Sequence, residues 1–399
     1  MLGVLDDFRR AQLAIAALFC FLGFQYATWA SRLPALKERL DLDESQLGLL
    51  LMACGVGAAV AFPLITFLMR RLGARRLALA SGLGMVAVLL GLGVAPNYPV
   101  ALLILFVDGM LVGCLNVAMN AQGAALEATY GRTAMAQLHA TFSAGSFLAA
   151  LVASGMNALT HDLVPHFAAA GLLLVLLLVG SRPRLLPDTP QEAPAEQKDT
   201  KRRRTLTRPS QITLWLGLAM VFGTVVEGAM NDWSALYMKE IAGASAQVAP
   251  LGIAVVSVMM VAARLLGDGW RSRWGDARLV RGGSAMAGIG LALALLAGGT
   301  VPALIGFAFV GLGVALVTPC LYVAAAAEGP DTLSLVAAMG TTGLLAGPAL
   351  IGFVAGFSSL VWGMAVVAAC AVLVSLCTTR VRFTVQEKTP GLATAEGTA

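Results

Sequence analysis

The residues most suited to chemistry lie in one short stretch, Gly223 to Glu240, within a long apolar region. Glu227, Asn231 and Asp232 fall within six residues of one another. A charged side chain at the centre of a membrane span costs roughly 2.5–3.5 kcal/mol to insert, so its default interpretation is functional. Glu227 and Asn231 share a helical face, whereas Asp232 is offset by ~100° and lies farther out. We expect Glu227 to exchange protons near mid-membrane and Asp232 to act at an outer gate or as a pairing partner. The alternative for Glu227 is a structural acid, neutral or paired with an arginine.

Asp108 is a second acid inside a predicted span. It lies about ten residues, or ~15 Å along a helix, from the start of the apolar run at 99–125. Asn116 and Asn120 follow one turn apart on a shared face. Asp108 is therefore the second candidate for proton exchange. The asparagines are candidates for binding a solute, and hydrogen bonding between helices is their alternative role.

Gln25, Trp29 and Arg32 lie on one face of the predicted first span, at spacings of four and three residues. We expect Gln25 and Trp29 to line the outer mouth of a cavity, and Arg32 to pair with an outer acid such as Asp41. The alternative is an interfacial tryptophan beside an arginine that reaches the membrane surface.

The candidate residues form two groups according to their place on the predicted spans. Those expected to bind the solute are Gln25, Trp29, Asn116, Asn120, Phe142, Asn231, Trp233, Thr318 and Tyr322. Those expected to form gates are Arg32, Asp232, Arg71, Arg75, Arg264, Asp268 and His139. Arg264 is expected to pair with Asp268 one turn later, and His139 could titrate near physiological pH.

Composition places these residues in a membrane protein. The 399 residues are 58% hydrophobic and only 12% charged, whereas soluble proteins average about 25% charged. The six cysteines show no metal-binding spacing, and no nucleophile stands beside a base in a recognisable motif. We therefore expect no metal, no cofactor and no enzymatic activity. The basic residues form short clusters between apolar runs, which argues against nucleic acid as a partner.

Hydropathy predicts an all-α polytopic membrane protein with twelve spans. The predicted spans are 11–31, 46–69, 77–95, 99–125, 135–157, 164–181, 211–237, 248–268, 279–298, 302–326, 333–356 and 358–378. With a cytoplasmic N-terminus, the inner segments carry 22 Lys and Arg residues and the outer segments carry 4. The positive-inside rule therefore places both termini in the cytoplasm.

A polar segment divides the chain into two halves that repeat. We predict a six-helix bundle at 1–181, a cytoplasmic linker at 182–210, a second six-helix bundle at 211–382 and a disordered cytoplasmic tail at 383–399. Trp29 precedes Gly48 by 19 residues, and Trp233 precedes Gly252 by the same interval. The inner loop at 70–82 likewise repeats in that at 272–284. Such parallel repeats are typical of transporters whose site lies between the halves.

Several strings in the chain resemble the major facilitator superfamily. They are WASRLP at 29–34, NVAMNAQG at 116–123, HATFSAG at 139–145 and GAMNDWSALY at 228–237. Together they are similar to the bacterial branch typified by the proteins MosC and YbjJ. The resemblance implies two pseudo-symmetric bundles that rock around a central site, and it implies little about the substrate.

The chain departs from the superfamily's signature loop, G-x-x-x-D-R-x-G-R-R. Arg71, Gly73 and Arg75 match, but Arg70 replaces the aspartate. The resemblance therefore implies that the charge pairs of the inner gate are rearranged. The second half offers Asp268 and Asp276 as partners.

These observations predict a secondary active transporter of a small polar solute that works by alternating access and is coupled to protons. The alternatives are an efflux antiporter for drugs or metabolites, and a membrane sensor that does not transport. The expected partners are the solute, protons and the lipid bilayer, and the expected state is a monomer. A bacterial inner membrane is the predicted location.

Overall fold

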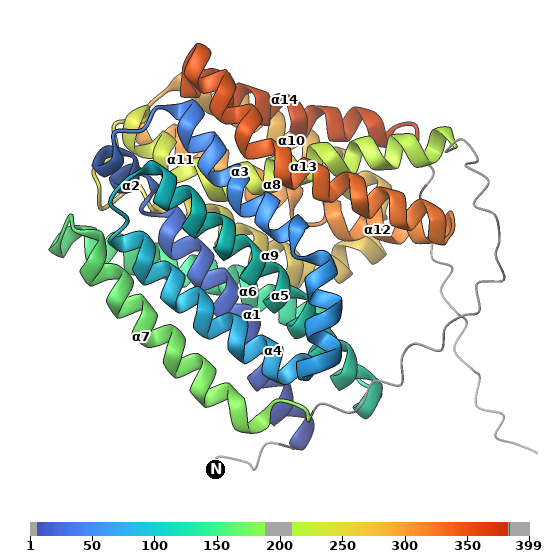
Figure 1. Cartoon of the computed structure of the whole chain (residues 1–399). Coiled ribbons are helices and arrows are strands. Elements are labelled where there is room, and N and C mark those ends of the chain that lie inside the picture. The colour runs from blue at the N-terminus through green and yellow to red at the C-terminus, as the bar shows by residue number, and fades with distance from the viewer. Residues whose placement is uncertain (1–5, 188–209, 382, 384–399) are drawn as a thin grey trace, which may run out of the picture.

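The computed structural model describes residues 6–187, 210–381 and 383 (Figure 1). The side chains of Ala136, Asp268 and Pro330 are outside the description, as are most of the predicted linker and tail. The described chain is built from α-helices, which the apolar composition requires, because a helix satisfies its own backbone hydrogen bonds inside a membrane.

The first half contains seven α-helices and a single 3₁₀ turn. They are α1 (Asp7–Ala30), α2 (Leu33–Leu40), α3 (Glu44–Val60), α4 (Phe62–Gly93), α5 (Tyr98–Tyr130), α6 (Met135–Leu159), α7 (Leu163–Ser181) and η1 (Arg182–Arg184). Short polar residues start several of these helices. Asp43 forms a capping box with Gln46, and Asn97 caps α5.

The second half contains the other seven described α-helices. They are α8 (Gln211–Glu240), α9 (Leu251–Trp274), α10 (Asp276–Ala297), α11 (Thr300–Val314), α12 (Val317–Ala327), α13 (Pro330–Phe357) and α14 (Leu360–Thr378). Across the described residues, ten helical segments are long and apolar enough to cross a membrane, and two shorter apolar helices accompany them. The predicted all-α polytopic fold is confirmed, with the predicted second span shared between α3 and the start of α4.

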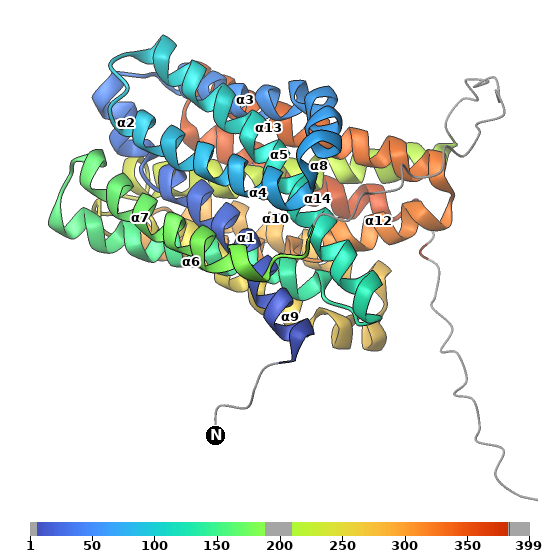
Figure 2. The ribbon, with the colours of Figure 1, turned by 60° about the horizontal axis from the view of Figure 1, so that its bottom comes forward.

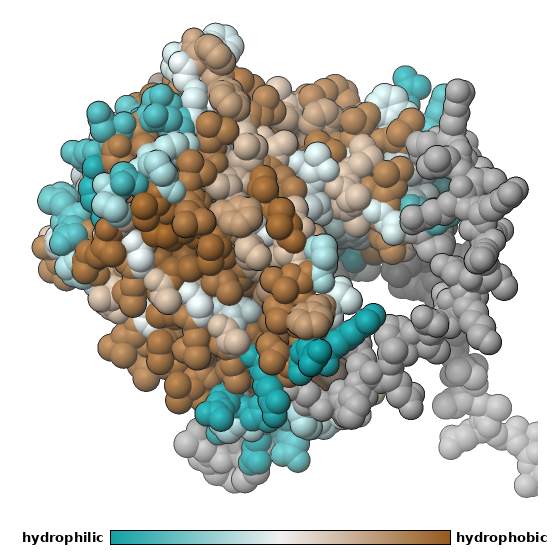
Figure 3. All heavy atoms as spheres, viewed as in Figure 1, coloured by the Kyte–Doolittle hydropathy of each residue, from teal (hydrophilic) through white to brown (hydrophobic). Residues whose placement is uncertain are grey.

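The two halves lie side by side and meet chiefly along four pairs of helices. α3 packs against α13, α6 packs against α9, and both α1 and α2 contact α8. Figure 1 shows these helices, apart from α2, near the middle of the molecule, with α7 at one edge, and Figure 2 shows α1 between α3 on one side and α9 on the other. In Figure 3, apolar surface covers the middle of the visible face between hydrophilic patches at its left and lower edges, as a membrane-spanning protein requires.

The internal repeat is visible in the backbone of the two inner loops. Gly73, inside α4, has φ 76° and ψ 170°, and Gly275, between α9 and α10, has φ 76° and ψ 152°. Both glycines adopt a backbone region that other residues essentially avoid. Each therefore reverses the chain between two spans at the same place in its half.

We predict that Gly275→Ala lowers the free energy of unfolding by about 1–3 kcal/mol, because a Cβ strains this backbone conformation. SDS titration in mixed micelles would measure the change. Gly282→Ala is the matched control: Gly282 lies in α10 with open space around its Cβ position, so alanine should stabilise the helix by about 0.5–1 kcal/mol. Equal effects of the two substitutions would contradict the assigned role of Gly275.

Candidate functional site

Hydrogen bonds and an ion pair hold the two halves together at the end that the basic residues predict to face outward, which is called the outer side below. Lys37 of α2 donates to Glu44 of its own half at 2.9 Å and to Glu240 of the other half at 2.8 Å. Asn157 Nδ2 donates to the Ala246 carbonyl at 2.7 Å, and the Ser154 hydroxyl donates to the Gln247 carbonyl at 2.6 Å. These links close the outer side of the molecule.

The Lys37 link is insensitive to pH in the physiological range. Burial lowers the pKa of Lys37, but the hydrogen bonds to Glu240 and Glu44 outweigh burial and the net pKa is raised. A lysine with a raised pKa contributes its full stabilisation below its ordinary pKa, and loses it only as the pH rises through the raised value. Lys37 therefore keeps its full contribution to the link between the halves across all physiological pH values.

Beneath this closed surface lie two buried carboxylates, and adjacent residues of α1 bind one each. Gln25 Nε2 donates to Asp108 Oδ1 of α5 at 3.0 Å, within the first half. The Tyr26 hydroxyl donates to Asp232 Oδ1 of α8, across the two halves. Asp108 and Asp232 are at most 2% exposed. Both carboxylates are thus buried away from solvent. Gln25 and Tyr26, which are adjacent on α1, link them to the same helix.

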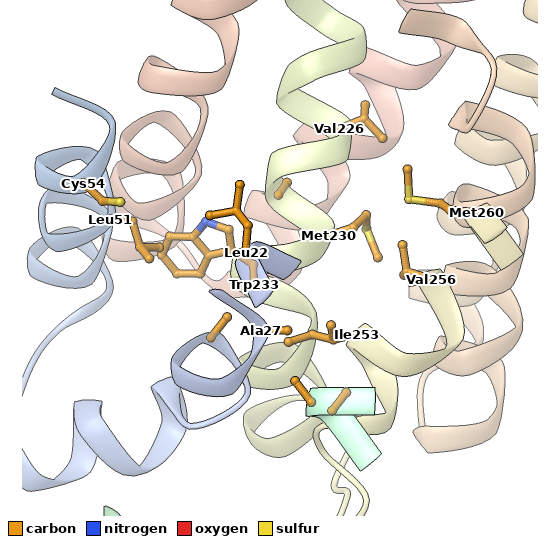
Figure 4. Packing of buried hydrophobic residues seen from close by; sticks show 14 of the residues in the cluster. Leu22, Ala27, Leu51, Cys54, Val226, Met230, Trp233, Ile253, Val256 and Met260 are labelled. Atoms are coloured by element: carbon orange, nitrogen blue, oxygen red, sulfur yellow. The ribbon is translucent and has the colours of Figure 1, made fainter. Parts of the chain in front are cut away.

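Trp29 and Trp233, the two tryptophans of the repeat, lie near these two buried carboxylates. Trp29 makes an edge-to-face contact with Tyr26, with ring centroids 4.8 Å apart. The Trp29 indole lies near the Asp108 carboxylate. Its Nε1 has no hydrogen-bond partner among the described residues. Trp233 extends from α8 toward Leu51 and Cys54 of α3, so it crosses between the halves (Figure 4). Both indoles help to close the outer side.

Farther from the outer surface, Glu227 of α8 pairs with Arg264 of α9. Arg264 Nη2 donates to Glu227 Oε1 at 3.0 Å, and Arg264 Nη1 donates to the Ser143 hydroxyl of α6, in the other half, at 2.8 Å. Each of Glu227 and Arg264 lies 13 residues, or ~20 Å, from the outer end of its helix. The Arg264 and Glu227 side chains are 19% and 26% exposed. This ion pair is therefore accessible to solvent, whereas Asp108 and Asp232 are buried.

Two titratable side chains flank the ion pair. His139 of α6 is exposed and lies within electrostatic range of both Arg264 and Glu227, and its ring packs on Phe19. Tyr322 of α12 lies within range of Glu227. Helices of both halves therefore contribute to one polar region at mid-depth.

The structure corrects two of the predicted partnerships. Arg32 does not pair with Asp41; its Nη2 donates to the His161 and Asp162 carbonyls at 2.9 and 2.7 Å, and its side chain is buried. Asp276, expected to serve the loop of the first half, binds Arg271 of its own loop through two hydrogen bonds. Arg264 pairs with Glu227; the Asp268 side chain is outside the description, so the predicted Arg264–Asp268 pair stays a prediction.

Asp232, predicted to act at an outer gate or as a pairing partner, is buried and accepts a hydrogen bond from Tyr26 of the other half; its gating role stays a prediction. Trp29 is 2% exposed and is therefore not an interfacial side chain.

The other predicted site residues occupy several places. Asn120 donates to Asn116 on the same helix at 2.7 Å. Asn231 donates to the Glu227 carbonyl, one turn away, at 3.0 Å. Phe142 is half-buried, and the Thr318 hydroxyl is buried with no partner among the described residues.

The basic residues of the first inner loop lie away from the polar centre. Arg71 stacks over Phe67, with 5.3 Å between the guanidinium carbon and the ring centroid, and Arg75 donates to the Arg182 carbonyl at 2.8 Å. Their predicted gating role stays a prediction.

Sequence reasoning did not select Tyr26 or Lys37 as site residues. Tyr26 is adjacent to Gln25 and is a polar side chain in an apolar span, a signal that could have identified it. Lys37 is one of only four bases on the predicted outer side, and Glu240 is an acid at the corresponding end of the second half. Both partners are more than 200 positions away in sequence, so spacing alone could not identify them.

The fold and this central polar region define a multi-pass membrane transporter, not an enzyme. The Major Facilitator Superfamily model matches residues 13–333, and the chain belongs to this superfamily. An uncharacterised MFS-type transporter of Yersinia pestis is 32% identical over 361 residues, which are 88% of this chain and 90% of the relative. The membrane protein MosC of Rhizobium meliloti is 29% identical over 350 residues, 86% of this chain and 83% of MosC. The predicted resemblance to this bacterial branch is confirmed.

Solved structures show the same fold. A point mutant of the nucleoside transporter NupG aligns with a TM-score of 0.74 at 16% identity, over 94% of this chain and 99% of NupG. A D-xylose-proton symporter aligns with a TM-score of 0.74 at 16% identity, over 94% of this chain and 98% of the symporter. At this identity the likeness concerns the fold alone.

We predict that Tyr26→Phe favours an outward-open conformation, because it removes a buried hydrogen bond between the halves. Such a bond contributes about 1–2 kcal/mol, so the ratio of open to closed molecules should rise about 5- to 30-fold. Double electron–electron resonance between spin labels at Glu38 and Ser245, both exposed on the outer surface, would measure it. Tyr237→Phe is the control, since Tyr237 packs on Phe307 within the second half. Equal distance distributions for Tyr26→Phe and the wild type would contradict the assignment.

We predict that Lys37→Gln weakens outer closure equally between pH 6 and pH 9, because Lys37 remains charged throughout this range. The same spin-label distance, recorded at several pH values, would measure the effect. The exposed neighbour Lys239 provides the control, and Lys239→Gln should leave the distance unchanged. An effect of Lys37→Gln that disappears within this pH range would show that another group controls closure.

Proposed function

We propose that this protein is a proton-coupled secondary transporter of a small polar solute and that the present structure is its inward-facing state. The superfamily moves small molecules across a membrane. The outer links support an outer side that is closed. The partly exposed Glu227–Arg264 pair supports access from the opposite side.

The observation that carries the proton coupling is the Glu227–Arg264–Ser143 arrangement. It places a carboxylate at mid-depth, within reach of solvent, in contact with a cation that itself contacts the other half. Taking up a proton removes the charge of Glu227 and releases Arg264. Because that change alters contacts between the halves, it provides a physical link between proton binding and rocking.

Asp108 is the second candidate for coupling. It is buried and bound to Gln25, so it has no solvent access in this state. Asp108 would exchange a proton only after the outer side opens. Glu227 and Asp108 would then act in different conformations of one cycle.

The setting proposed for this activity is a bacterial inner membrane, with both termini in the cytoplasm and the protein acting as a monomer. The asymmetric distribution of basic residues supports this orientation. The proposed division into bundles at 1–181 and 211–382, joined by a cytoplasmic linker at 182–210, follows the repeat and the helix bounds.

We predict that Glu227→Gln abolishes accumulation driven by a pH gradient but retains solute counterflow, because glutamine keeps the shape of the side chain and cannot exchange a proton. The solute would first be identified by thermal-shift screening of the purified protein against a metabolite library. Uptake and counterflow would then be measured in proteoliposomes. Asp108→Asn, measured in parallel, tests the second candidate.

The matched control is Glu328→Gln, which removes an exposed carboxylate after α12 and should transport like the wild type. If Glu227→Gln accumulates solute as well as the wild type under a pH gradient, the coupling assignment is wrong.

A further inference from the structure

We infer that the transported solute carries a carboxylate and that Arg264 binds this carboxylate once Glu227 has taken up a proton. The inference rests on the proposed function and names the substrate class of the same site.

With its described partners, the Arg264 guanidinium uses only part of its hydrogen-bonding capacity. Its guanidinium makes one hydrogen bond to Glu227 and one to Ser143. A guanidinium and a carboxylate can form two parallel bonds, as Arg271 and Asp276 do in the inner loop at 2.8 and 2.9 Å. The Glu227 contact is therefore the weaker, single-point form. Arg264 remains partly exposed and could accept a second carboxylate.

The chemistry of the pair determines which partner a proton can release. A carboxylate becomes neutral when it binds a proton, whereas a guanidinium remains charged under all physiological conditions. Protonation therefore always releases the cation and never the anion. A site that opens in this way selects a negatively charged ligand.

Charge balance excludes the other solute classes for this site. An amine would bind Glu227 and leave Arg264 uncompensated at mid-membrane, and no proton could relieve that charge. A neutral polyol would leave Arg264 uncompensated whenever Glu227 was protonated. A monocarboxylate replaces the lost charge of Glu227, so one proton and one solute anion cross together with no net charge.

Among the side chains that the structure describes, few other groups near the ion pair can take the proton. His139 of α6 and Tyr322 of α12 face the pair, and α1 brings Tyr26 toward Asp232 farther out. α2 contributes Lys37 at the outer end. In the described helices α11, α13 and α14, the only charged or histidine side chain is Asp331, in the first turn of α13. The cysteines of α14 are buried. Glu227 and His139 are therefore the two groups to test.

The test is isothermal titration calorimetry on the purified full chain. The probes are a panel of small monocarboxylates bearing hydroxyl, amino or keto groups, each paired with its neutral amide or alcohol. Titrations in buffers of different ionisation enthalpy count the protons taken up. The variants are Glu227→Gln, Arg264→Lys, His139→Gln and the double variant Glu227→Gln/Arg264→Gln, which leaves no unpaired charge and so keeps the fold testable.

For the wild type we expect binding of carboxylates with uptake of one proton, so that affinity rises tenfold for each unit of acidification. Glu227→Gln should bind the same carboxylates at neutral pH with no proton uptake. The double variant should lose at least tenfold in carboxylate affinity and none for neutral ligands, while Arg264→Lys retains part of the affinity through its point charge. His139→Gln should keep the proton uptake.

Three results would overturn the inference: binding confined to neutral probes, carboxylate binding that the double variant retains, or loss of proton uptake in His139→Gln. Proton-driven uptake of a neutral probe by proteoliposomes, without carboxylate binding, would refute the carboxylate site but leave the proposed transporter intact. Carboxylate binding that depends on Arg264, without flux of any probe, would refute the proposed transport but leave the site intact.

Discussion

A charge inside a membrane must be compensated, and the Glu227–Arg264 ion pair meets this requirement where the two halves of the protein meet. Arg264 is a mid-span cation, and removing its partner would leave it uncompensated in a region of low dielectric constant. Because Arg264 also contacts Ser143 of the other half, the charge state of Glu227 affects the contact between the halves. Arg264 thus links the charge state of Glu227 to the packing of the two halves.

The two buried acids nearer the outer surface, Asp108 and Asp232, are stabilised by hydrogen bonds and, among the described residues, not by an ion pair. Asp108 and Asp232 are buried and bound to neutral donors, but one oxygen of Asp108, Gln25 Oε1 and the indole nitrogens of Trp29 and Trp233 have no hydrogen-bond partners among the described residues. A partly satisfied buried network is costly. Asp108 and Asp232 therefore depend on the few donors that contact them, Gln25 and Tyr26.

The fold was predictable because its signals are local. Apolar length, basic loops and the repeated tryptophan interval predict the spans and the two halves, and the paired glycines Gly73 and Gly275 share one backbone conformation. The depth of Glu227 was also predictable, since it depends on distance along one helix. The partners were not, because they depend on packing between helices. Tyr26 and Asp232 are 206 residues apart, and Arg264 pairs with Glu227, 37 positions away.

The repeat extends to the tryptophans but not to the acids, and this asymmetry assigns different roles to the two buried carboxylates. Gln25 and Asp108 belong to one half, so their hydrogen bond can persist when the halves rock. Tyr26 and Asp232 belong to different halves, so their hydrogen bond must break when the outer side opens. In the proposed rocking movement, opening would expose Asp232 on the outer side and close the region of Glu227 on the inner side. Because Asp232 and Glu227 both lie on α8, one helix would carry a carboxylate for each face of the membrane, and the movement that gives solvent access to one would remove it from the other.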